Sequence, residues 1–338
     1  MTTCMWSDAM AAALDGPDGF YRTNSPDTHF RTSVNASPLL AASIVPLVVA
    51  VDAALDHPER LDVVDMGAGD GSLLRGLLKE LPADLARRVD PVAVEIRTRP
   101  AELPAQVTWT EVPPSGVSGL VIAHEYLDNV PCDLVEVAEG GSLQQVLVAP
   151  TTGEESLGPA LDDEQRDWIK RWWPLSEPGD RAEIGLARDQ TWSQIVSGLS
   201  SGIALAVDYG HLRNERVAGA YPAGTLTGYR NGHQVAPIPD GSCDITAHVA
   251  MDACAQAGAD AGAHASALVS QSEALRALGL DARRPPIELA SSNPQGYIES
   301  LSSASHAAEL LDPASLGSFW WLLQAKGCRP VVGGIEWS

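Results

Sequence analysis

The chain has 338 residues, 45% of them hydrophobic, which is enough to build the core of one large α/β domain or of two smaller ones. Its 44 acidic and 22 basic residues give a formal net charge of −22, which disfavours binding to phosphate backbones and anionic lipid. We therefore expect neither a nucleic acid nor a membrane as partner, whereas a basic protein segment remains compatible with this charge.

Five cysteines are scattered along the chain without a C-x-x-C spacing, and their number is odd. This pattern fits reduced thiols in a cytoplasmic protein better than a disulfide framework or a zinc site, so no metal is expected. The first twenty residues have no basic start, and Asp8 and Asp15 interrupt their apolar stretch. They do not resemble a signal or transit peptide, and the expected location is cytoplasmic.

The first half of the chain alternates between strand and helix patterns. After a short helix and a loop in residues 1–30, helix formers fill residues 36–56. This apolar run contains Pro46 and is too short for a membrane span, so a buried helix is expected. The strand, helix, strand order that follows is typical of a parallel βαβ unit. Its predicted elements are strands at 61–67, 91–96, 107–112 and 118–131, the last running into a loop, and an amphipathic helix at 72–89.

The alternation lapses between 132 and 200, which we interpret as an insertion between the fourth and fifth core strands. Residues 132–149 predict a hairpin with Gly140 and Gly141 at its turn, and residues 150–200 predict helices. The fifth core strand is predicted at 202–210, before a stretch rich in Gly, Pro and Asn. Later predicted elements are helices at about 246–260, 266–280 and 318–327, and a possible final strand at 329–334.

The stretch "VVDMGAGDGSLLRG" at 63–76 ends an apolar strand with an acid and turns through three glycines into a helix. Glycine is needed where a Cβ would collide with a ligand or where φ is positive, and N–H groups at a helix start can contact a ligand. The nicotinamide fingerprint G-x-G-x-x-G/A does not fit, because Ser72 stands where Gly or Ala is required. A pyrophosphate ligand is therefore disfavoured.

S-Adenosylmethionine is the alternative ligand, because it has no phosphates and carries an amino-acid end and a sulfonium. Asp65, just before the turn, suits such groups, and Glu95, at the end of the second strand, is expected to bind the ribose hydroxyls. Together they predict the nucleotide site of a class I methyltransferase; the alternative is a loop that only turns the chain. The predicted cofactor-binding residues are Asp65, Gly67, Ala68, Gly69, Asp70, Gly71, Glu95 and His124.

Polar residues also follow the fourth and fifth strands, at the edge where open α/β sheets bind ligands. "AHEYLDNVP" places His124, Glu125, Asp128 and Asn129 after the fourth strand, and "VDYGH" places Asp208 and Tyr209 after the fifth. Glu125, Asp128 and Asp208 are predicted to be catalytic, and Tyr209 to contact the substrate. The alternatives are solvated loop acids, a histidine packed under the turn, and an aspartate that caps a turn.

Several motifs resemble the MidA family of class I methyltransferases, the group that includes the mitochondrial complex I assembly methyltransferase. They are "GPDGFYRT", "HFRTS", "VVDMGAGDGSLLRGLL", "HEYLDNVP", "AVDYG", "GTLTGYRNGH", "CDITAHV" and "SQSEALRALG", in this order over most of the chain. This sequence departs from the family's N-E-x-x-D-A-x-P motif, with His124 in place of Asn and Asn129 in place of Ala.

The resemblance implies an α/β, Rossmann-like fold with a mostly parallel seven-stranded sheet and helices on both faces. It implies an N-terminal helical extension at 1–56 over the cofactor, and a methyltransferase domain at 57–338 with the insertion at about 132–200. It also implies S-adenosylmethionine as methyl donor, S-adenosylhomocysteine as product, and an arginine of a protein partner as acceptor. A homodimer is possible.

Three further residues are predicted on the substrate side. Tyr21 and Arg31 lie in the N-terminal motifs that carry the resemblance, although Arg31 is equally suited to holding down that loop. His248 is also predicted to be catalytic, behind Glu125 and Asp128; its alternative is a core histidine bonded to Asp244 or to backbone. The sequence leaves open a methyltransferase of small molecules and a non-catalytic assembly factor that binds the cofactor.

Overall fold

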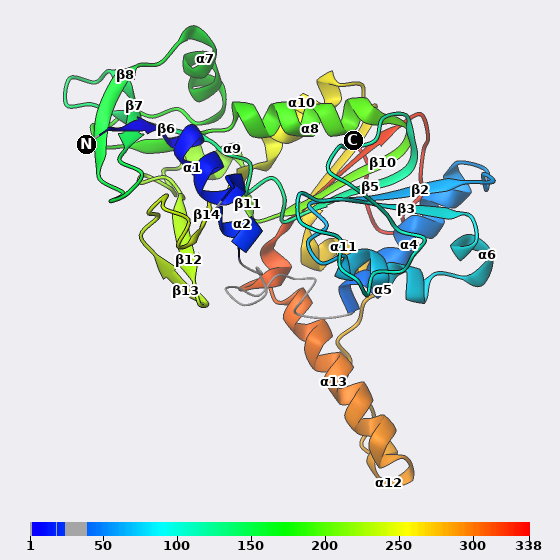
Figure 1. Cartoon of the computed structure of the whole chain (residues 1–338). Helices are drawn as coiled ribbons and strands as arrows, with labels where there is room; N and C mark the ends of the chain where they lie inside the picture. Colours follow the sequence, from blue (N-terminus) through cyan, green and yellow to red (C-terminus); the bar gives the residue numbers. More distant parts are fainter. Residues whose placement is uncertain (1, 18, 24–38) are drawn as a thin grey trace. The chain divides into compact units, whose positions relative to one another are not determined.

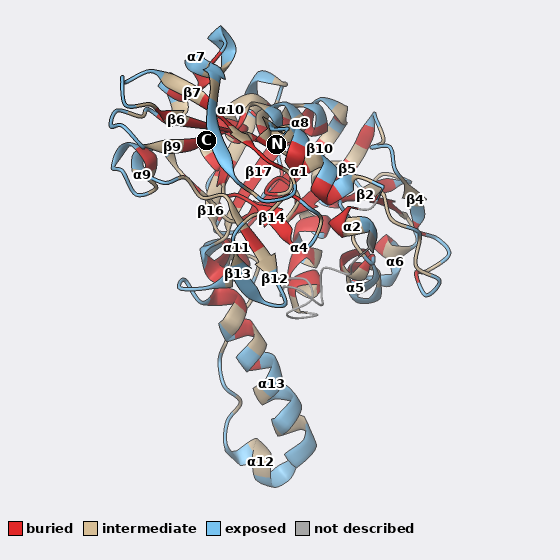
Figure 2. Ribbon diagram, turned by 60° about the vertical axis from the view of Figure 1, so that its left-hand side comes forward, coloured by how far each residue is buried: buried red, intermediate tan, exposed pale blue. Residues whose placement is uncertain are grey.

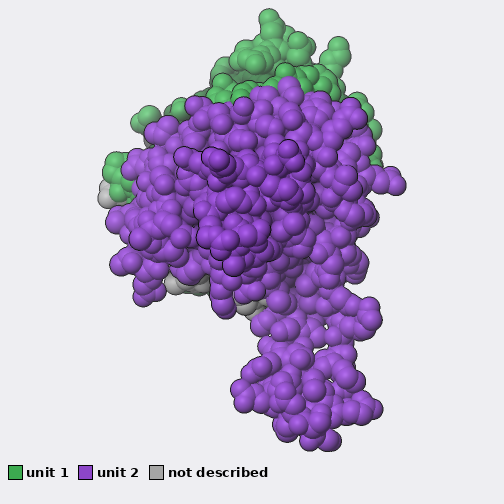
Figure 3. Space-filling model, turned by 90° about the vertical axis from the view of Figure 1, so that its right-hand side faces the viewer, with its two compact units in different colours: residues 1–31, 125–197, 208–261 green, residues 32–124, 198–207, 262–338 purple. Residues whose placement is uncertain are grey.

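The computed structural model describes residues 2–17, 19–23 and 39–338, which form two compact units (Figures 1 and 3). Unit 1 comprises Met1–Arg31, Glu125–Ser197 and Asp208–Ala261. Unit 2 comprises Thr32–His124, Gly198–Val207 and Gly262–Ser338. Each unit is assembled from segments that are far apart in the sequence, because the chain passes between them several times.

Unit 2 is built on a seven-stranded sheet of order β16-β17-β10-β5-β2-β3-β4, which confirms the predicted α/β fold. The pairs β10–β5, β5–β2, β2–β3 and β3–β4 are parallel, whereas β16 and β17 are antiparallel. Met66 pairs with both Val94 and Ala123, so the glycine turn and Glu95 follow strands that end level with one another. The strands are β2 (Leu61–Met66), β3 (Val89–Val94), β4 (Thr108–Thr110), β5 (Val117–His124), β10 (Leu199–Asp208), β16 (Ala265–Ser270) and β17 (Trp320–Lys326).

The core of unit 2 lies between one face of this sheet and its helices. Alternate strand residues point to the same face, and Val63, Leu120 and Leu205 share a buried apolar cluster with α4 and α5. Figure 2 shows α13 (Pro294–Leu311) largely exposed, and its buried residues, Ala304, Ala307, Leu310 and Leu311, all lie in its C-terminal half. The helices are α4 (Leu39–Ala54), α5 (Ser72–Glu80), α6 (Ala83–Ala86), α11 (Gln271–Ala277), α12 (Glu288–Ser292), α13 (Pro294–Leu311) and the 3₁₀ helix η2 (Leu316–Ser318).

The single helix expected at 72–89 is wrong, because the structure breaks it into α5 and α6. Pro82 has no backbone N–H and disfavours helical backbone in the preceding residue, and Leu81 is extended with ψ of 142°. α4 contains Pro46 in its interior, as the sequence predicts.

Two helices predicted near the end of the chain are also wrong in part. Residues 266–280 form strand β16 followed by the shorter helix α11, and residues 318–327 form strand β17 instead of a helix. The register pairs Ala267 with Leu323 and Val269 with Trp321; of these, Ala267, Trp321 and Leu323 are buried and Val269 is partly buried. The possible strand at 329–334 is irregular.

The described residues of unit 1 form three small sheets. The largest has the order β1-β7-β6-β9, with β8 paired to β7, and the predicted hairpin at 132–149 is its β6–β7 pair. A three-stranded sheet has the order β13-β12-β14, and β11 pairs in parallel with β15. The strands are β1 (Cys4–Met5), β6 (Asp133–Val137), β7 (Leu143–Val148), β8 (Glu155–Ala160), β9 (Arg181–Ile184), β11 (Gly210–His211), β12 (Thr227–Arg230), β13 (His233–Val235), β14 (Asp244–Thr246) and β15 (Val249–Ala250).

The helices of unit 1 pack on these sheets in two apolar clusters, one around Trp6 and Met10 and one around Trp168 and Ala182. The prediction that 150–200 is helical is wrong for β8 and β9, and α7 begins with a capping box at Asp162. The helices are α1 (Trp6–Asp15), α2 (Phe20–Thr23), α7 (Asp163–Trp172), α8 (Leu186–Gly198), α9 (Arg213–Val217) and α10 (Met251–Asp260).

The units divide the chain differently from the expected boundary between 56 and 57. Residues 1–31 belong to unit 1, whereas α4 belongs to the core of unit 2, because α4 is apolar on most of its surface. None of the described helices is long and apolar enough to cross a membrane.

Candidate functional site

The glycine turn after β2 has the backbone that its sequence predicts. Gly67, Gly69 and Gly71 have φ of 66°, 63° and 76°, in the left-handed region that glycine adopts without steric cost. A Cβ on Gly71 would lie 2.5 Å from Leu103 Cδ1, and a Cβ on Gly69 would lie 3.1 Å from Arg97 Nη2. The turn is therefore covered closely by the segment that follows β3, and it leads directly into α5.

Glu95 follows β3 and its carboxylate points to the glycine turn. Its Oε2 atom accepts a hydrogen bond of 2.9 Å from the Gly69 N–H. Its Oε1 atom accepts one of 3.0 Å from the Arg97 N–H and lies 3.4 Å from Arg97 Nε. Glu95, which is predicted to bind the ribose hydroxyls, is 8% exposed. Its hydrogen bond with Gly69 connects it to the predicted turn.

Asp65, the other predicted acid of this site, is 3% exposed. Its Oδ2 atom is buried and has no hydrogen-bond partner among the described residues. Burial, together with the smaller effects of the negative charges of Glu95 and Asp70, raises the pKa of Asp65 to about 8. An unsatisfied buried oxygen is costly, so this atom marks a position where a polar ligand group would fit.

The remaining residues predicted to bind the cofactor differ in surroundings. Asp70 is bound within the turn itself, where it accepts hydrogen bonds from Ser72 N and Ser72 Oγ at 2.9 and 2.6 Å. Burial opposes ionisation of Asp70, but these bonds and the charge of Arg75 lower its pKa. Ala68 is buried, and His124 is buried at the end of β5, where desolvation lowers its pKa to about 4.

In unit 1, the turn that follows Glu125 is held by Asp208. Asp208 Oδ2 accepts hydrogen bonds from the backbone N–H groups of Leu127 and Asp128 at 3.0 and 3.2 Å. Asp208 is fully buried and its Oδ1 atom has no hydrogen-bond partner in the described part of the chain. Burial raises the pKa of Asp208 well above its usual value, and the nearby Asp128 and Glu125 raise it further. Glu125 has φ of 48°, which is rare for a residue with a side chain.

Asp128 is the centre of a hydrogen-bonded group. Its Oδ2 atom accepts from the Tyr209 hydroxyl and, at 2.8 Å, from Thr246 Oγ1, and its Oδ1 atom accepts from Asn129 Nδ2 at 2.9 Å. Burial raises the pKa of Asp128, although the bonds from Tyr209 and Thr246 oppose that rise. The structure thus joins two predicted residues, Asp128 and Tyr209, and adds Thr246, which was not predicted.

Tyr21 extends this group to Asp244. The Tyr21 hydroxyl lies 2.5 Å from Asn129 Oδ1 and 2.6 Å from Asp244 Oδ1. Burial raises the pKa of Asp244 to about 7, partly opposed by its hydrogen bond with Tyr21. Asp244 lies in the motif that supports the MidA resemblance, but the sequence did not indicate its link to Tyr21.

A buried arginine, Arg188 of α8, donates hydrogen bonds to backbone carbonyls of and around the Asp128 group. It is 1% exposed and donates to the backbone carbonyls of Val130, His248 and Asp128 at 3.2, 2.9 and 2.9 Å. Burial opposes the charge of its guanidinium, but the nearby groups Cys132, Glu183, Asp128 and Asp208 raise the pKa of Arg188. Sequence analysis missed this residue.

His248 lies beside Tyr209 but does not bond to Asp244, which was one of its expected alternatives. Its N–H donates to Thr225 Oγ1 at 2.9 Å, its carbonyl accepts from Arg188, and its ring meets the Tyr209 ring edge-on at 5.4 Å. Its Nδ1 atom is buried without a partner in the described structure, and desolvation lowers its pKa to about 4. Both hydrogen bonds use backbone atoms of His248, so neither expected alternative, a ring bonded to Asp244 or to backbone, is found among the described residues.

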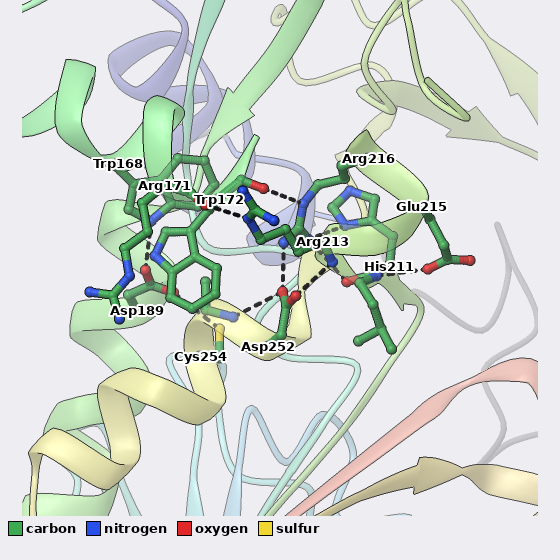
Figure 4. Close-up of polar contacts among 12 residues, drawn as sticks. Trp168, Arg171, Trp172, Asp189, His211, Arg213, Glu215, Arg216, Asp252 and Cys254 are labelled. Atoms are coloured by element: carbon green, nitrogen blue, oxygen red, sulfur yellow. Dashed lines mark hydrogen bonds and ion pairs between the residues drawn. The ribbon is translucent and has the colours of Figure 1, made fainter. Parts of the chain in front are cut away.

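Figure 4 shows a second polar group, which fixes α9 and α10 in unit 1. Arg216 Nη2 donates to Asp252 Oδ1 at 2.6 Å, and Arg216 Nη1 lies 2.9 Å from His211 Nδ1. Asp189 accepts from Trp168 Nε1 at 2.7 Å. These contacts hold the His211 ring 6.1 Å from that of His248, and His211 Nε2 is buried without a hydrogen-bond partner among the described residues.

The predicted residues thus fall into two groups. In unit 2, the glycine turn and Glu95 share hydrogen bonds, with Asp65 buried just before the turn. In unit 1, Asp128, Asp208, Tyr209 and Tyr21 share one network with Asn129, Thr246 and Asp244. Arg31 lies outside the described residues. Within residues 2–17, 19–23 and 39–338, no group of three or more His, Cys, Asp or Glu side chains is placed to hold a metal ion.

Comparison with known proteins gives a family match and a fold match. Residues 39–269 match the model of a family described as "Putative S-adenosyl-L-methionine-dependent methyltransferase". A crystal structure from Burkholderia thailandensis, described as a "likely methyl transferase" bound to S-adenosyl-homocysteine, is 24% identical in sequence; the match covers 99% of this chain and 92% of that chain, with a TM-score of 0.83. A native crystal structure from the same organism is also 24% identical; the match covers 99% of this chain and 91% of that chain, with a TM-score of 0.81. A comparison with curated protein sequences gives no match.

Proposed function

The chain belongs to the family of S-adenosyl-L-methionine-dependent methyltransferases whose model its residues 39–269 match, and on this premise we propose that it methylates an arginine in a basic segment of a protein partner. S-Adenosylmethionine is the cofactor of this family. The resemblance of the motifs to the MidA family supports the arginine, and the net charge of −22 favours a basic partner.

The residues of unit 2 fit the cofactor. The glycine turn offers backbone close to a ligand, and Glu95 offers a carboxylate for the two ribose hydroxyls. The unpartnered Oδ2 atom of Asp65 suits the amino group at the other end of the molecule. When bound, S-adenosylmethionine supplies an electrophilic methyl group, and these side chains would hold it by its ribose and its amino-acid end.

The observation that carries the acceptor proposal is the backbone of Glu125. A residue other than glycine is strained at a φ of 48°. Such residues persist where the surrounding structure fixes them for a function. Asn129 Nδ2 donates to the Glu125 carbonyl at 3.2 Å, and Asp208 holds the next two N–H groups of the turn. Glu125 is therefore a carboxylate on a fixed turn, which suits paired hydrogen bonds to a planar guanidinium.

An arginine acceptor must lose a proton to expose a nitrogen lone pair to the methyl group. A carboxylate that binds two guanidinium N–H groups both orients the nitrogen and can take up that proton. We assign this role to Glu125, with Asp208 and Asp128 as positioning residues, since both are buried and use their oxygens to hold the turn. Tyr209 and His248 border these acids and would contact the acceptor side chain.

The direct test is methyl transfer from radiolabelled S-adenosylmethionine to a bacterial lysate, separated into protein and small-molecule fractions. The proposal expects label in protein that is recovered as methylarginine after hydrolysis. Glu125→Gln should lower transfer at least 100-fold while S-adenosylhomocysteine binding, measured by calorimetry, stays within about twofold.

Glu139→Gln is the matched control, because Glu139 is an exposed acid of the β6–β7 turn. It should leave transfer unchanged. Label only in the small-molecule fraction would favour a small-molecule methyltransferase, and cofactor binding without any transfer would favour an assembly factor. Either result would overturn the arginine proposal.

A further inference from the structure

Arg97, two residues after Glu95, forms an ion pair and a hydrogen bond with the Glu95 carboxylate, which the proposed cofactor site needs. Arg97 Nε lies 3.4 Å from Glu95 Oε1, and the Arg97 N–H donates to the same oxygen at 3.0 Å. The Arg97 side chain is 20% exposed and that of Glu95 is 8% exposed, so both charges are largely removed from water. The guanidinium also lies over the turn, since a Cβ on Gly69 would come 3.1 Å from Arg97 Nη2.

The hydrogen-bonding capacity of Glu95 makes this placement significant. An ionised carboxylate accepts about four hydrogen bonds. The Gly69 N–H uses one position on Oε2, and the N–H and Nε of Arg97 face Oε1. One position then remains, whereas two ribose hydroxyls require two. The Nε contact is the one to yield, because 3.4 Å is long for a hydrogen bond and its atoms belong to a side chain.

We propose that Arg97 sets the affinity and ribose selectivity of the cofactor site, by holding the Glu95 carboxylate until the ribose hydroxyls displace its guanidinium. This inference rests on the proposed cofactor site and adds a residue to it. Only the side chain of Arg97 has to move, because its backbone carbonyl is held by a 2.9 Å hydrogen bond from Trp109 Nε1.

The surrounding segment is fixed in the same way. Arg99 donates to the carbonyls of Val107, Leu103 and Pro104, which ties residues 99–107 into one loop. Leu103 of that loop lies against Gly71. Ligand binding can therefore exchange one ion pair for hydroxyl contacts without rebuilding the loop that covers the turn.

The test is calorimetric binding of S-adenosylhomocysteine to the full chain and to Arg97→Met, which removes the charge and keeps an unbranched side chain. Because the ligand no longer has to break an ion pair, Arg97→Met should bind about three to ten times more tightly. With 2′,3′-dideoxyadenosine as probe, which lacks both hydroxyls, the wild type and the variant should bind equally. Arg97→Gln should behave as Arg97→Met does, which guards against an effect peculiar to methionine.

Arg75→Met is the matched control. Arg75 pairs with Asp70 of the same turn at 3.5 Å, so its removal changes the local charge equally but leaves Glu95 untouched. It should not change the affinity for S-adenosylhomocysteine. Weaker or unchanged binding by both Arg97 variants, or an equal gain with the dideoxy probe, would overturn the inference. If the wild type itself does not bind S-adenosylhomocysteine, or Glu95→Gln binds it as well as the wild type, the proposed cofactor site fails instead.

Discussion

The Tyr21 hydroxyl in α2 and the Asp244 carboxyl in β14 lie 2.6 Å apart, although the two residues are 223 positions apart in the chain. The same hydroxyl lies 2.5 Å from Asn129 Oδ1. The orientation of the Asn129 amide is fixed, because its nitrogen donates to Asp128 Oδ1 and to the Glu125 carbonyl. One hydroxyl proton cannot serve two acceptors, so Asp244 satisfies the group only when it carries a proton itself.

Replacing Asp244 by asparagine should therefore be stabilising at neutral pH. Burial raises the pKa of Asp244 to about 7 in the folded protein, against about 3.9 in the unfolded chain. The folded state then binds the extra proton, so the free energy of unfolding falls as pH rises from about 4 to about 7, by up to about 1.4 kcal/mol per pH unit. Urea denaturation should show Asp244→Asn gaining on the wild type between pH 5 and pH 7.5. Parallel pH profiles for the two proteins would show that Asp244 is ionised in the fold.

A second pH dependence concerns cofactor binding at Asp65. Burial, followed by Glu95 and Asp70, raises the pKa of Asp65 to about 8 in the free protein. An ammonium group bound at this carboxylate would lower that pKa, so binding below pH 8 must release a proton. The affinity for S-adenosylhomocysteine should rise up to tenfold between pH 6 and pH 7, and Asp65→Asn should bind weakly at both. Calorimetry in buffers of different ionisation enthalpy counts the released proton; a count of zero contradicts the role of Asp65.

The glycine turn can be tested with a pair of alanine substitutions in unit 2. Gly71 and Gly116 have similar φ of 76° and 74°, but only a Cβ on Gly71 meets another residue, at 2.5 Å from Leu103 Cδ1. Gly116→Ala should cost about 1 kcal/mol from the left-handed backbone alone. Gly71→Ala should cost about 2–3 kcal/mol and should also weaken S-adenosylhomocysteine binding, because Leu103 must move. Equal losses in urea denaturation would mean that the covering loop yields freely.

Arg188 should be the most sensitive position of unit 1. Arg188→Met leaves the carbonyls of Val130, His248 and Asp128 without this donor and removes the charge that faces the buried acids. The expected loss is about 3–5 kcal/mol, measured by urea denaturation. Arg188→Lys should not restore stability, because a single ammonium cannot reach carbonyls in three directions. Full rescue by lysine would show that charge alone matters.

The fold was predictable where an apolar run and the polar residues or glycines that end it indicate the same element. β2, β3, β5 and β10 are apolar runs that end in acids or glycines, and they were found close to their observed positions. β16 and β17 were missed because their Ala and Leu residues favour helix locally, whereas pairing of the two strands decides their structure. Pairing between strands that are distant in the chain cannot be predicted from a sequence window of ten residues.

The candidate site shows the same limit. The glycine turn and Glu95 are local signals at the ends of strands, and the structure joins them by a hydrogen bond. Asp244 and Thr246 alternate along β14 and so share one face, a pattern that could have placed them together; in the structure Thr246 binds Asp128 and Asp244 binds Tyr21. Arg188 had no such signal, because the carbonyls that it binds lie 58 to 60 positions away in the chain.

The order of strands in unit 2 has a consequence for biosynthesis. β17 follows every other strand of its sheet along the chain, yet it lies between β16 and β10. While the ribosome is still making residues before 320, β10 has an unprotected edge and β16 has no neighbour in the sheet. The nascent chain must therefore keep that edge from pairing with other polypeptides, and a ribosome that stalls late would release a product prone to aggregation.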